Sequence, residues 1–193
     1  MRIYLFICIC YSLSVMFSSC RNTHAYDKYI KELDSLRVVV QQSVDNFKSL
    51  DSTTCVDAYR KQNTYLLFID SHLKDTVTKS VAENLQKFHS ISKGLHDYVV
   101  FRSSWLNNAQ LSINQLQTLS HDLKNGSVDH EDAIGFINDE KKRAEKVIEE
   151  LKLNTDLVRK HLDVFHQSLP ACENLVKELN SGVLPELLKP NLK

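Results

Sequence analysis

The sequence predicts an all-α fold, an antiparallel bundle of four or alternatively five helices that contains one long coiled-coil-like hairpin. Three observations support this fold class. The 193 residues include only four glycines and three prolines, so long stretches lack helix breakers. Apolar residues between Leu85 and Leu169 recur at alternating steps of three and four, which is the spacing of one helical face. A polar segment, 124–129, separates two such runs, and its Gly126 is suited to ending a helix.

The two apolar runs around this segment form heptad seams that predict the hairpin. The first run consists of Leu85, Phe88, Ser92, Leu95, Val99, Arg102, Leu106, Ala109, Ile113, Leu116, Ser120 and Leu123. The second run consists of Ile134, Ile137, Lys141, Ala144, Ile148, Leu151, Thr155, Val158, Leu162, Phe165 and Leu169. Because a short turn joins them, we expect two long helices that fold back on each other along these seams.

One polar position in the first seam bears on the register of the hairpin. If Leu123 faces Ile134, the antiparallel pairing places Arg102 opposite Thr155. An arginine in an apolar seam is costly unless it is hydrogen-bonded or reaches water. We therefore interpret Arg102 as a residue that fixes register or extends to solvent, with a binding role as the alternative.

A second apolar edge runs beside the first seam. Ile91, Tyr98, Trp105 and Leu119 follow one another at seven-residue spacing, interrupted by Ser112. Wide apolar faces normally serve the core, so we expect this edge to receive the earlier helices. The alternative is that Tyr98 and Trp105 form a partner surface, if the hairpin extends beyond a shorter first helix.

The first half of the chain predicts more helix but leaves its breaks open. Apolar spacing predicts a helix over 27–50, which the segment 51–54 ends and from which the next helix is capped. Two further breaks are candidates, one within 74–80 and one at Gly94. One break gives a four-helix up-down bundle, and both give five antiparallel segments.

The two cysteines of the predicted domain, Cys55 and Cys172, depend on this choice. Four antiparallel helices would place them at opposite ends of the bundle, whereas bonded cysteines need Cα atoms within about 7 Å. Five segments would bring both to the same end, where an oxidising compartment would allow a disulfide. A Cys55–Cys172 disulfide would therefore indicate the five-segment arrangement.

The first residues predict an export signal. Arg2 precedes an apolar run over 3–17, which is too short to span a bilayer comfortably, and small residues follow. The stretch Phe17-Ser18-Ser19-Cys20 resembles the lipobox of Gram-negative bacterial lipoproteins. That resemblance implies cleavage before Cys20, a lipid on its thiol and attachment to a membrane. Because Arg21 rather than an aspartate follows, it also implies sorting to the outer membrane.

Cleavage by an ordinary signal peptidase is the alternative. Thr23-His24-Ala25 is a passable small-x-small site, and cleavage there would release a secreted protein that begins at Tyr26. In the preferred interpretation, residues 1–19 are a lipoprotein-type signal peptide and residues 20–26 a short tether. Residues 27–193 then form a single helical-bundle domain, within the usual size range for one core.

Composition and motifs exclude several function classes. The chain carries 24 basic and 24 acidic residues spread along its length, so we expect no nucleic-acid partner. No catalytic or phosphate-binding motif occurs, and we expect neither an enzyme nor a cofactor. The best group of metal-type side chains flanks the hairpin turn, and we interpret it as helix capping rather than a metal site. This group comprises His121, Asp122, Asp129, His130, Glu131 and Asp132.

The C-terminal segment predicts a break and a docked tail. Pro170 is expected to end the long helix, because proline lacks the backbone donor that the helix needs. The leucines within 183–189 are expected to dock on the bundle, and an undocked tail is the alternative.

The sequence thus favours an exported, membrane-anchored helical lipoprotein that acts as a non-enzymatic protein-interaction or envelope scaffold module. One alternative is a freely secreted, signalling-type helical ligand, for which Asn125-Gly126-Ser127 would be a glycosylation site. Another is a carrier that holds an apolar ligand between its helices. Membrane attachment through Cys20 and an unidentified protein partner are the interactions that the first interpretation requires.

Overall fold

The computed structural model describes residues 23–189, and the predicted signal peptide with Cys20 lies outside this range. Five α-helices and one short 3-10 helix make up the described chain. They are η2 (Thr23–Tyr26), α2 (Asp27–Lys48), α3 (Ser52–His72), α4 (Lys79–Ser90), α5 (Ser92–Lys124) and α6 (His130–Leu179). No strand occurs among these residues, and the predicted all-α bundle is confirmed.

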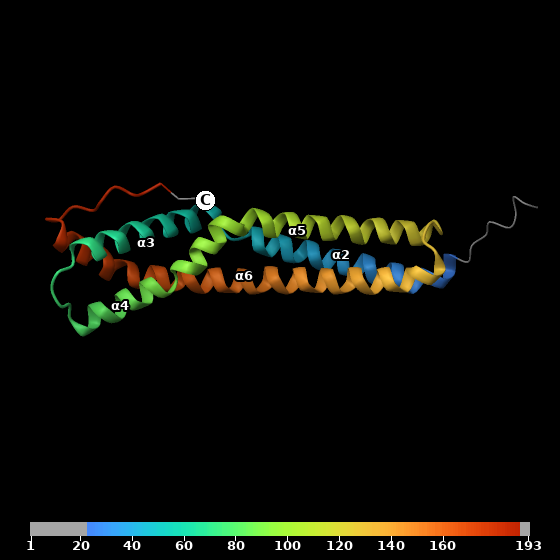
Figure 1. Cartoon of the computed structure of the whole chain (residues 1–193), viewed down its shortest axis with the longest axis horizontal. Helices are drawn as coiled ribbons and strands as arrows, with labels where there is room; N and C mark the ends of the chain where they lie inside the picture. Colours follow the sequence, from blue (N-terminus) through green and yellow to red (C-terminus); the bar gives the residue numbers. More distant parts are fainter. Residues whose placement is uncertain (1–22, 190–193) are drawn as a thin grey trace, which may run out of the picture.

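The helices form a long rod with three legs (Figure 1). The first leg is α2 followed by α3 in the same direction, and the second leg is α4 followed by α5 in the return direction. The third leg is α6 alone, whose 50 residues span about 75 Å at the standard helical rise. α5 and α6 pack side by side in opposite directions, which confirms the predicted long hairpin.

Two interhelical contacts show that α2 and α6 run parallel. Lys141 Nζ donates to Glu32 Oε2 at 2.8 Å, and Arg159 Nη2 donates to Asn46 Oδ1 at 2.8 Å. A step forward along α2, from Glu32 to Asn46, is therefore also a step forward along α6. The rod is an up-down-up bundle in which α5 runs against both of its neighbours.

The predicted reversal of direction at every break is wrong. The candidate break within 74–80 exists as the loop 73–78, but the one at Gly94 does not, because Gly94 lies inside α5 and the chain bends at Ile91 instead. Between the described helices, the chain reverses only at 73–78 and at 125–129. Ile91 is buried and keeps near-helical backbone angles (φ −92°, ψ −4°), so α4 and α5 are two arms of one bent helix. At the junction of α2 and α3, Leu50 is buried in the same core as Phe47, and α3 does not fold back on α2.

The apolar core divides into two clusters along the rod. The first core joins α2, α5 and the first half of α6, and its fully buried large side chains are Leu33, Phe47, Tyr98, Leu116, Leu123, Ile137 and Leu151. The second core joins α3, α4, the start of α5 and the end of α6, and its fully buried large side chains are Tyr65, Phe88, Ile91 and Leu95. Val99 and Leu162 pack against both clusters, so the two cores are continuous.

Both predicted seams face the core, with one exception. Every residue of the first seam is buried or half-buried. In the second seam, Ile134 is 39% exposed, and Ala133 is buried in its place. Tyr26 is buried in the same core as Ala133.

The turn between α5 and α6 has the geometry that Gly126 predicts. Gly126 has a φ of 65°, and its N–H donates to the Leu123 carbonyl at 3.3 Å. The N–H of Ser127 donates to the Asp122 carbonyl at 2.9 Å. These two bonds are those of a Schellman motif, so Gly126 ends α5 as predicted.

The prediction that Pro170 ends the long helix is wrong. α6 continues through Pro170 and ends at Leu179. A proline in a helix interior costs about 3 kcal/mol or more. The turns that follow bury Cys172, Leu175 and Val176 in the second core, and this burial offsets the cost.

Candidate functional site

The middle of the rod gathers several residues that the sequence singles out. Arg102 Nε donates to the Tyr98 hydroxyl at 3.1 Å, and the buried Cys55 thiol is close enough to this hydroxyl to influence its pKa. The Phe47 ring of α2 lies against two rings of α5, with centroids 5.7 Å from Tyr98 and 5.8 Å from Trp105. We call this group the joint cluster, because it lies at the junction of α2 and α3. It consists of Phe47, Cys55, Tyr98, Arg102 and Trp105.

The second apolar edge of α5 packs against α2 in the joint cluster. Tyr98 is only 1% exposed, and Trp105 is half-buried against the first core. The edge receives α2 through Phe47, as the core interpretation expects, and Tyr98 is not available as a partner surface. The hairpin is not left uncovered either, because α2 and α3 lie end to end along the rod.

Chemically, the joint cluster is a structural network rather than a reactive one. Burial raises the pKa of the Tyr98 phenol and of the Cys55 thiol, so both groups stay protonated near neutral pH. A protonated, buried thiol is a poor nucleophile and a poor metal ligand. The cluster therefore locks the helices together and offers no activated group.

The polar layer expected from the seam register is satisfied within each helix. Arg102 bonds Tyr98 one turn earlier in α5, and the Thr155 hydroxyl donates to the Leu151 carbonyl in α6 at 2.6 Å. Arg102 is half-buried, as expected for a side chain that extends from a seam toward solvent. Its hydrogen bond to a core tyrosine supports the structural interpretation.

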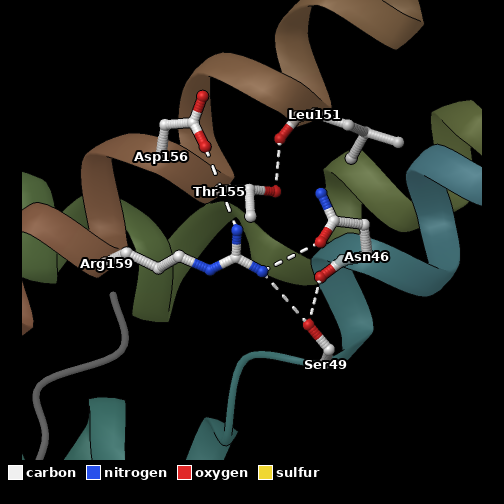
Figure 2. A network of polar contacts seen from close by, with 6 residues as sticks. All are labelled: Asn46, Ser49, Leu151, Thr155, Asp156 and Arg159. Atoms are coloured by element: carbon white, nitrogen blue, oxygen red, sulfur yellow. Dashed lines mark hydrogen bonds and ion pairs between the residues drawn. The ribbon is translucent and has the colours of Figure 1, made fainter.

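A polar contact from α6 fastens the end of α2 (Figure 2). Arg159 Nη2 donates to Asn46 Oδ1 at 2.8 Å and to Ser49 Oγ at 3.4 Å, while Ser49 Oγ donates to the Asn46 carbonyl at 2.6 Å. Asp156 pairs with the same guanidinium at 4.0 Å. A cation at a helix C-terminus is favoured by the helix dipole. No sequence motif connects Arg159 with Asn46, so this contact could not be predicted from the sequence.

The two cysteines lie in different parts of the rod and are not bonded. Cys55 is buried in the first core and Cys172 in the second core, and both are free. Burial, with a contribution from Glu173, raises the pKa of Cys172 to about 12. The disulfide expected of an alternating five-segment bundle is absent from the described residues, because the two breaks at 49–51 and Ile91 bend the chain without reversing it.

Both thiols are expected to resist modification in the folded protein. Differential alkylation with iodoacetamide, read by peptide mass spectrometry, should label neither Cys55 nor Cys172 before denaturation and both afterwards, because thiolate formation and access are suppressed by burial. Recovery of the two residues in one disulfide-linked peptide pair would contradict the structure.

A second close contact lies beside the bend at Ile91. A Cβ atom placed on Gly94 would lie 1.9 Å from Cε1 and 2.0 Å from Nδ1 of His161, so the imidazole occupies space that only a glycine leaves. Nδ1 of His161 is buried and makes no hydrogen bond within the described residues. Burial, and then the charge of Lys160, lowers the pKa of His161. Gly94 therefore does not break the helix but lets α6 approach α5.

The lowered pKa of His161 predicts a loss of stability in mild acid. The unfolded histidine binds a proton below about pH 6.5, whereas the folded one resists protonation, so stability is full above that pH and falls as the pH drops toward the folded pKa. Urea unfolding at pH 7.5 and 5 should show this fall, and His161→Gln should reduce it. His166→Gln, at an exposed position, serves as the control. An equal fall in both variants would contradict the assignment.

The acidic and histidine side chains at the hairpin turn do not assemble into a metal site. No group of three or more metal-type side chains converges anywhere in the described residues. Glu131 and Asp132 lie in the first turn of α6, where negative charge complements the helix dipole.

Among the described helices, none is both long enough and apolar enough to cross a bilayer.

A polar clamp on α3 holds the C-terminal tail. Arg60 Nε donates to the Leu188 carbonyl at 3.0 Å, and the Leu188 N–H donates to Thr64 Oγ1 at 3.0 Å. Leu184 and Leu187 pack half-buried against the second core, which confirms that the tail docks. The sequence predicted the docking of the leucines but not the clamp, because Arg60 and Thr64 resemble any half-polar helix face.

A groove with a volume of about 670 Å³ lies between α2 and α6. The Lys141–Glu32 ion pair crosses it, and Lys28, Lys31 and Glu145 border it. Leu36 and Val39 supply its apolar lining. Charged residues border the groove, whereas most of the surface that lines it is apolar, so the groove does not decide against the alternative of an apolar-ligand carrier.

Comparison of the chain with family models, curated proteins and solved structures gave no match.

Proposed function

We propose that this protein is an exported, lipid-anchored helical rod that acts without catalysis, as a spacer or scaffold presenting a protein-binding end away from an outer membrane. The observation that carries this proposal is the placement of the two ends of the first leg. Tyr26 is buried at the end of the rod where α5 turns into α6, and the loop 73–78 lies at the opposite end. An anchor at Cys20 would therefore hold one end of the rod near the membrane.

Three features support a spacer over other functions. The continuous α6 gives the rod a span of about 75 Å, well beyond the thickness of a bilayer headgroup region. The two apolar cores are continuous, and together with the joint cluster they stiffen the rod at its two helix junctions, α2–α3 and α4–α5. The buried thiol and phenol groups have raised pKa values, which is the opposite of the activation that a nucleophile requires.

Free secretion is the second candidate, and one observation favours it. Asn125 of the Asn-Gly-Ser sequence is exposed at the end of α5, where a glycan would meet no obstruction from the core. A glycan on Asn125 together with a mature N-terminus at Tyr26 would favour this candidate over the lipid-anchored rod.

Metabolic labelling with an alkyne-tagged palmitate in a Gram-negative host tests the anchor. The full chain should incorporate the label and fractionate with the outer membrane, and Cys20→Ser should abolish both. Cys8→Ser is the matched control, because the proposed cleavage removes Cys8 with the signal peptide. A mature chain that begins at Tyr26 without acyl mass would overturn the proposal.

A further inference from the structure

The C-terminal tail takes an unusual path for a chain end. α6 ends in a second Schellman-type cap, in which the Gly182 N–H donates to the Lys177 carbonyl at 2.7 Å, and both Ser181 (φ 52°) and Gly182 (φ 88°) have positive φ. The cap turns the chain back, and the tail then runs along α3 toward the middle of the rod (Figure 1). The tail thus leaves its own helix and contacts a different one.

The clamp on α3 binds main-chain groups of the tail. Arg60 and Thr64 together bind both the carbonyl and the N–H of Leu188, each at 3.0 Å. Thr64 is oriented by donating its own hydroxyl to the Arg60 carbonyl at 2.7 Å, and Asp57 pairs with the Arg60 guanidinium at 3.7 Å. Because main-chain groups carry the polar recognition, the clamp would accept other extended peptides as well as this one.

The side chains of the tail provide shallow apolar anchoring. Leu184 and Leu187, three residues apart, are half-buried against the second core, whereas Val183 and Leu188 are 63% and 44% exposed. Pro185, between them, restricts the backbone to the extended form and lowers the entropy cost of docking. The attachment consists of two clamp hydrogen bonds and two partly covered leucines, which marks a segment of low local stability.

We propose that the clamp is a docking site for an extended, leucine-rich peptide of a partner protein, and that residues 183–189 occupy this site in cis until the partner displaces them. The peptide would carry two leucines three residues apart, with a free backbone N–H and carbonyl just after the second. The tail itself, seated on the site, defines this chemistry. The inference deepens the proposed scaffold function and rests on it for the existence of a partner.

A partner peptide must compete with residues 183–189 of the same chain for the clamp. A short tether holds the tail at an effective concentration on the order of millimolar, so a free peptide competes poorly with it. Releasing the tail should therefore expose a site that binds the same peptide added in trans. The full-length chain with Leu184→Asp and Leu187→Asp is the tail-released variant, because charged side chains would not stay against the second core.

Fluorescence anisotropy with a labelled peptide of the sequence of residues 183–189 tests the site. The tail-released variant should bind the peptide about tenfold or more tightly than the native chain does. Adding Arg60→Met and Thr64→Val should reverse this gain, because the clamp hydrogen bonds are lost. Val183→Asp, a charge at an exposed tail position, is the matched control and should behave as the native chain. A folded tail-released variant that does not bind the peptide would overturn the proposal.

A measurement on the native chain covers the case in which the variant does not fold. The Leu188 N–H, bound to Thr64 Oγ1, should exchange more slowly than the same N–H in the free peptide. Unlabelled peptide at a concentration above the effective concentration of the tail should speed this exchange by displacing the tail. An exchange rate that the peptide leaves unchanged would overturn the proposal. Both measurements are made without membranes, so their failure would leave the lipid anchor standing, and failure of Cys20 lipidation would leave the peptide site standing.

Discussion

Replacing Phe47 with alanine is expected to destabilise the protein by about 3–5 kcal/mol, the usual cost of deleting a buried aromatic ring. Phe47 is fully buried and contacts both Tyr98 and Trp105, so the deletion opens a cavity where α2 ends and the joint cluster begins. Urea unfolding followed by circular dichroism measures the loss. The emission of Trp105 should also shift to the red in the folded variant, because its ring would become more hydrated.

The matched control for Phe47 is Val38→Ala on the same helix. Val38 is 51% exposed, and its truncation should change the free energy of unfolding by less than about 0.5 kcal/mol. A loss below about 1 kcal/mol for Phe47→Ala would mean that α2 does not cover the second apolar edge of α5.

Replacing Gly94 with alanine is expected to destabilise the protein by about 1–3 kcal/mol, although alanine is the better helix former. The new methyl group would meet the imidazole of His161 at 1.9 Å, so the ring must leave its place between α5 and α6. Thermal unfolding measures the effect. The double variant with His161→Ala should recover part of the loss, because the clash is then removed.

Gly135→Ala is the control that measures how much the higher helix propensity of alanine alone changes the free energy of unfolding. Gly135 also lies inside a helix, but beyond the adjacent backbone of that helix no atom lies within 4 Å of its added Cβ, so alanine there should stabilise the protein by about 0.5–1 kcal/mol. The two glycine substitutions should therefore have opposite signs. Equal stabilisation at both positions would contradict the close approach of His161 to α5.

The sequence predicted the parts of the fold that depend on local periodicity and turn chemistry. The two seams and the Gly126 turn can be read from residues close together in the chain, and they are present in the structure. The path of the first leg could not be read in this way. Whether α3 folds back on α2 or continues the leg depends on the burial of Leu50 with Phe47 in the first core, which is a tertiary property.

The errors have a common physical origin. Pro170 carries a strong local signal against helix, yet packing of the following turns in the second core overrides it. The clamp was missed because it joins Leu188 to Thr64 and Arg60, which lie 124 and 128 residues away in the chain. Arg159 and Asn46 are likewise 113 residues apart. No periodic pattern connects such pairs, so only the folded rod brings them together.

The parallel arrangement of α2 and α6 is the central structural claim, and zero-length carbodiimide cross-linking followed by mass spectrometry tests it most directly. The up-down-up rod predicts an amide link between Glu32 and Lys141, whose side-chain atoms lie 2.8 Å apart and remain accessible to the reagent. In an antiparallel pairing, Glu32 would instead face the far end of α6. A dominant link from Glu32 to Lys160 or Lys177, with none to Lys141, would contradict the structure.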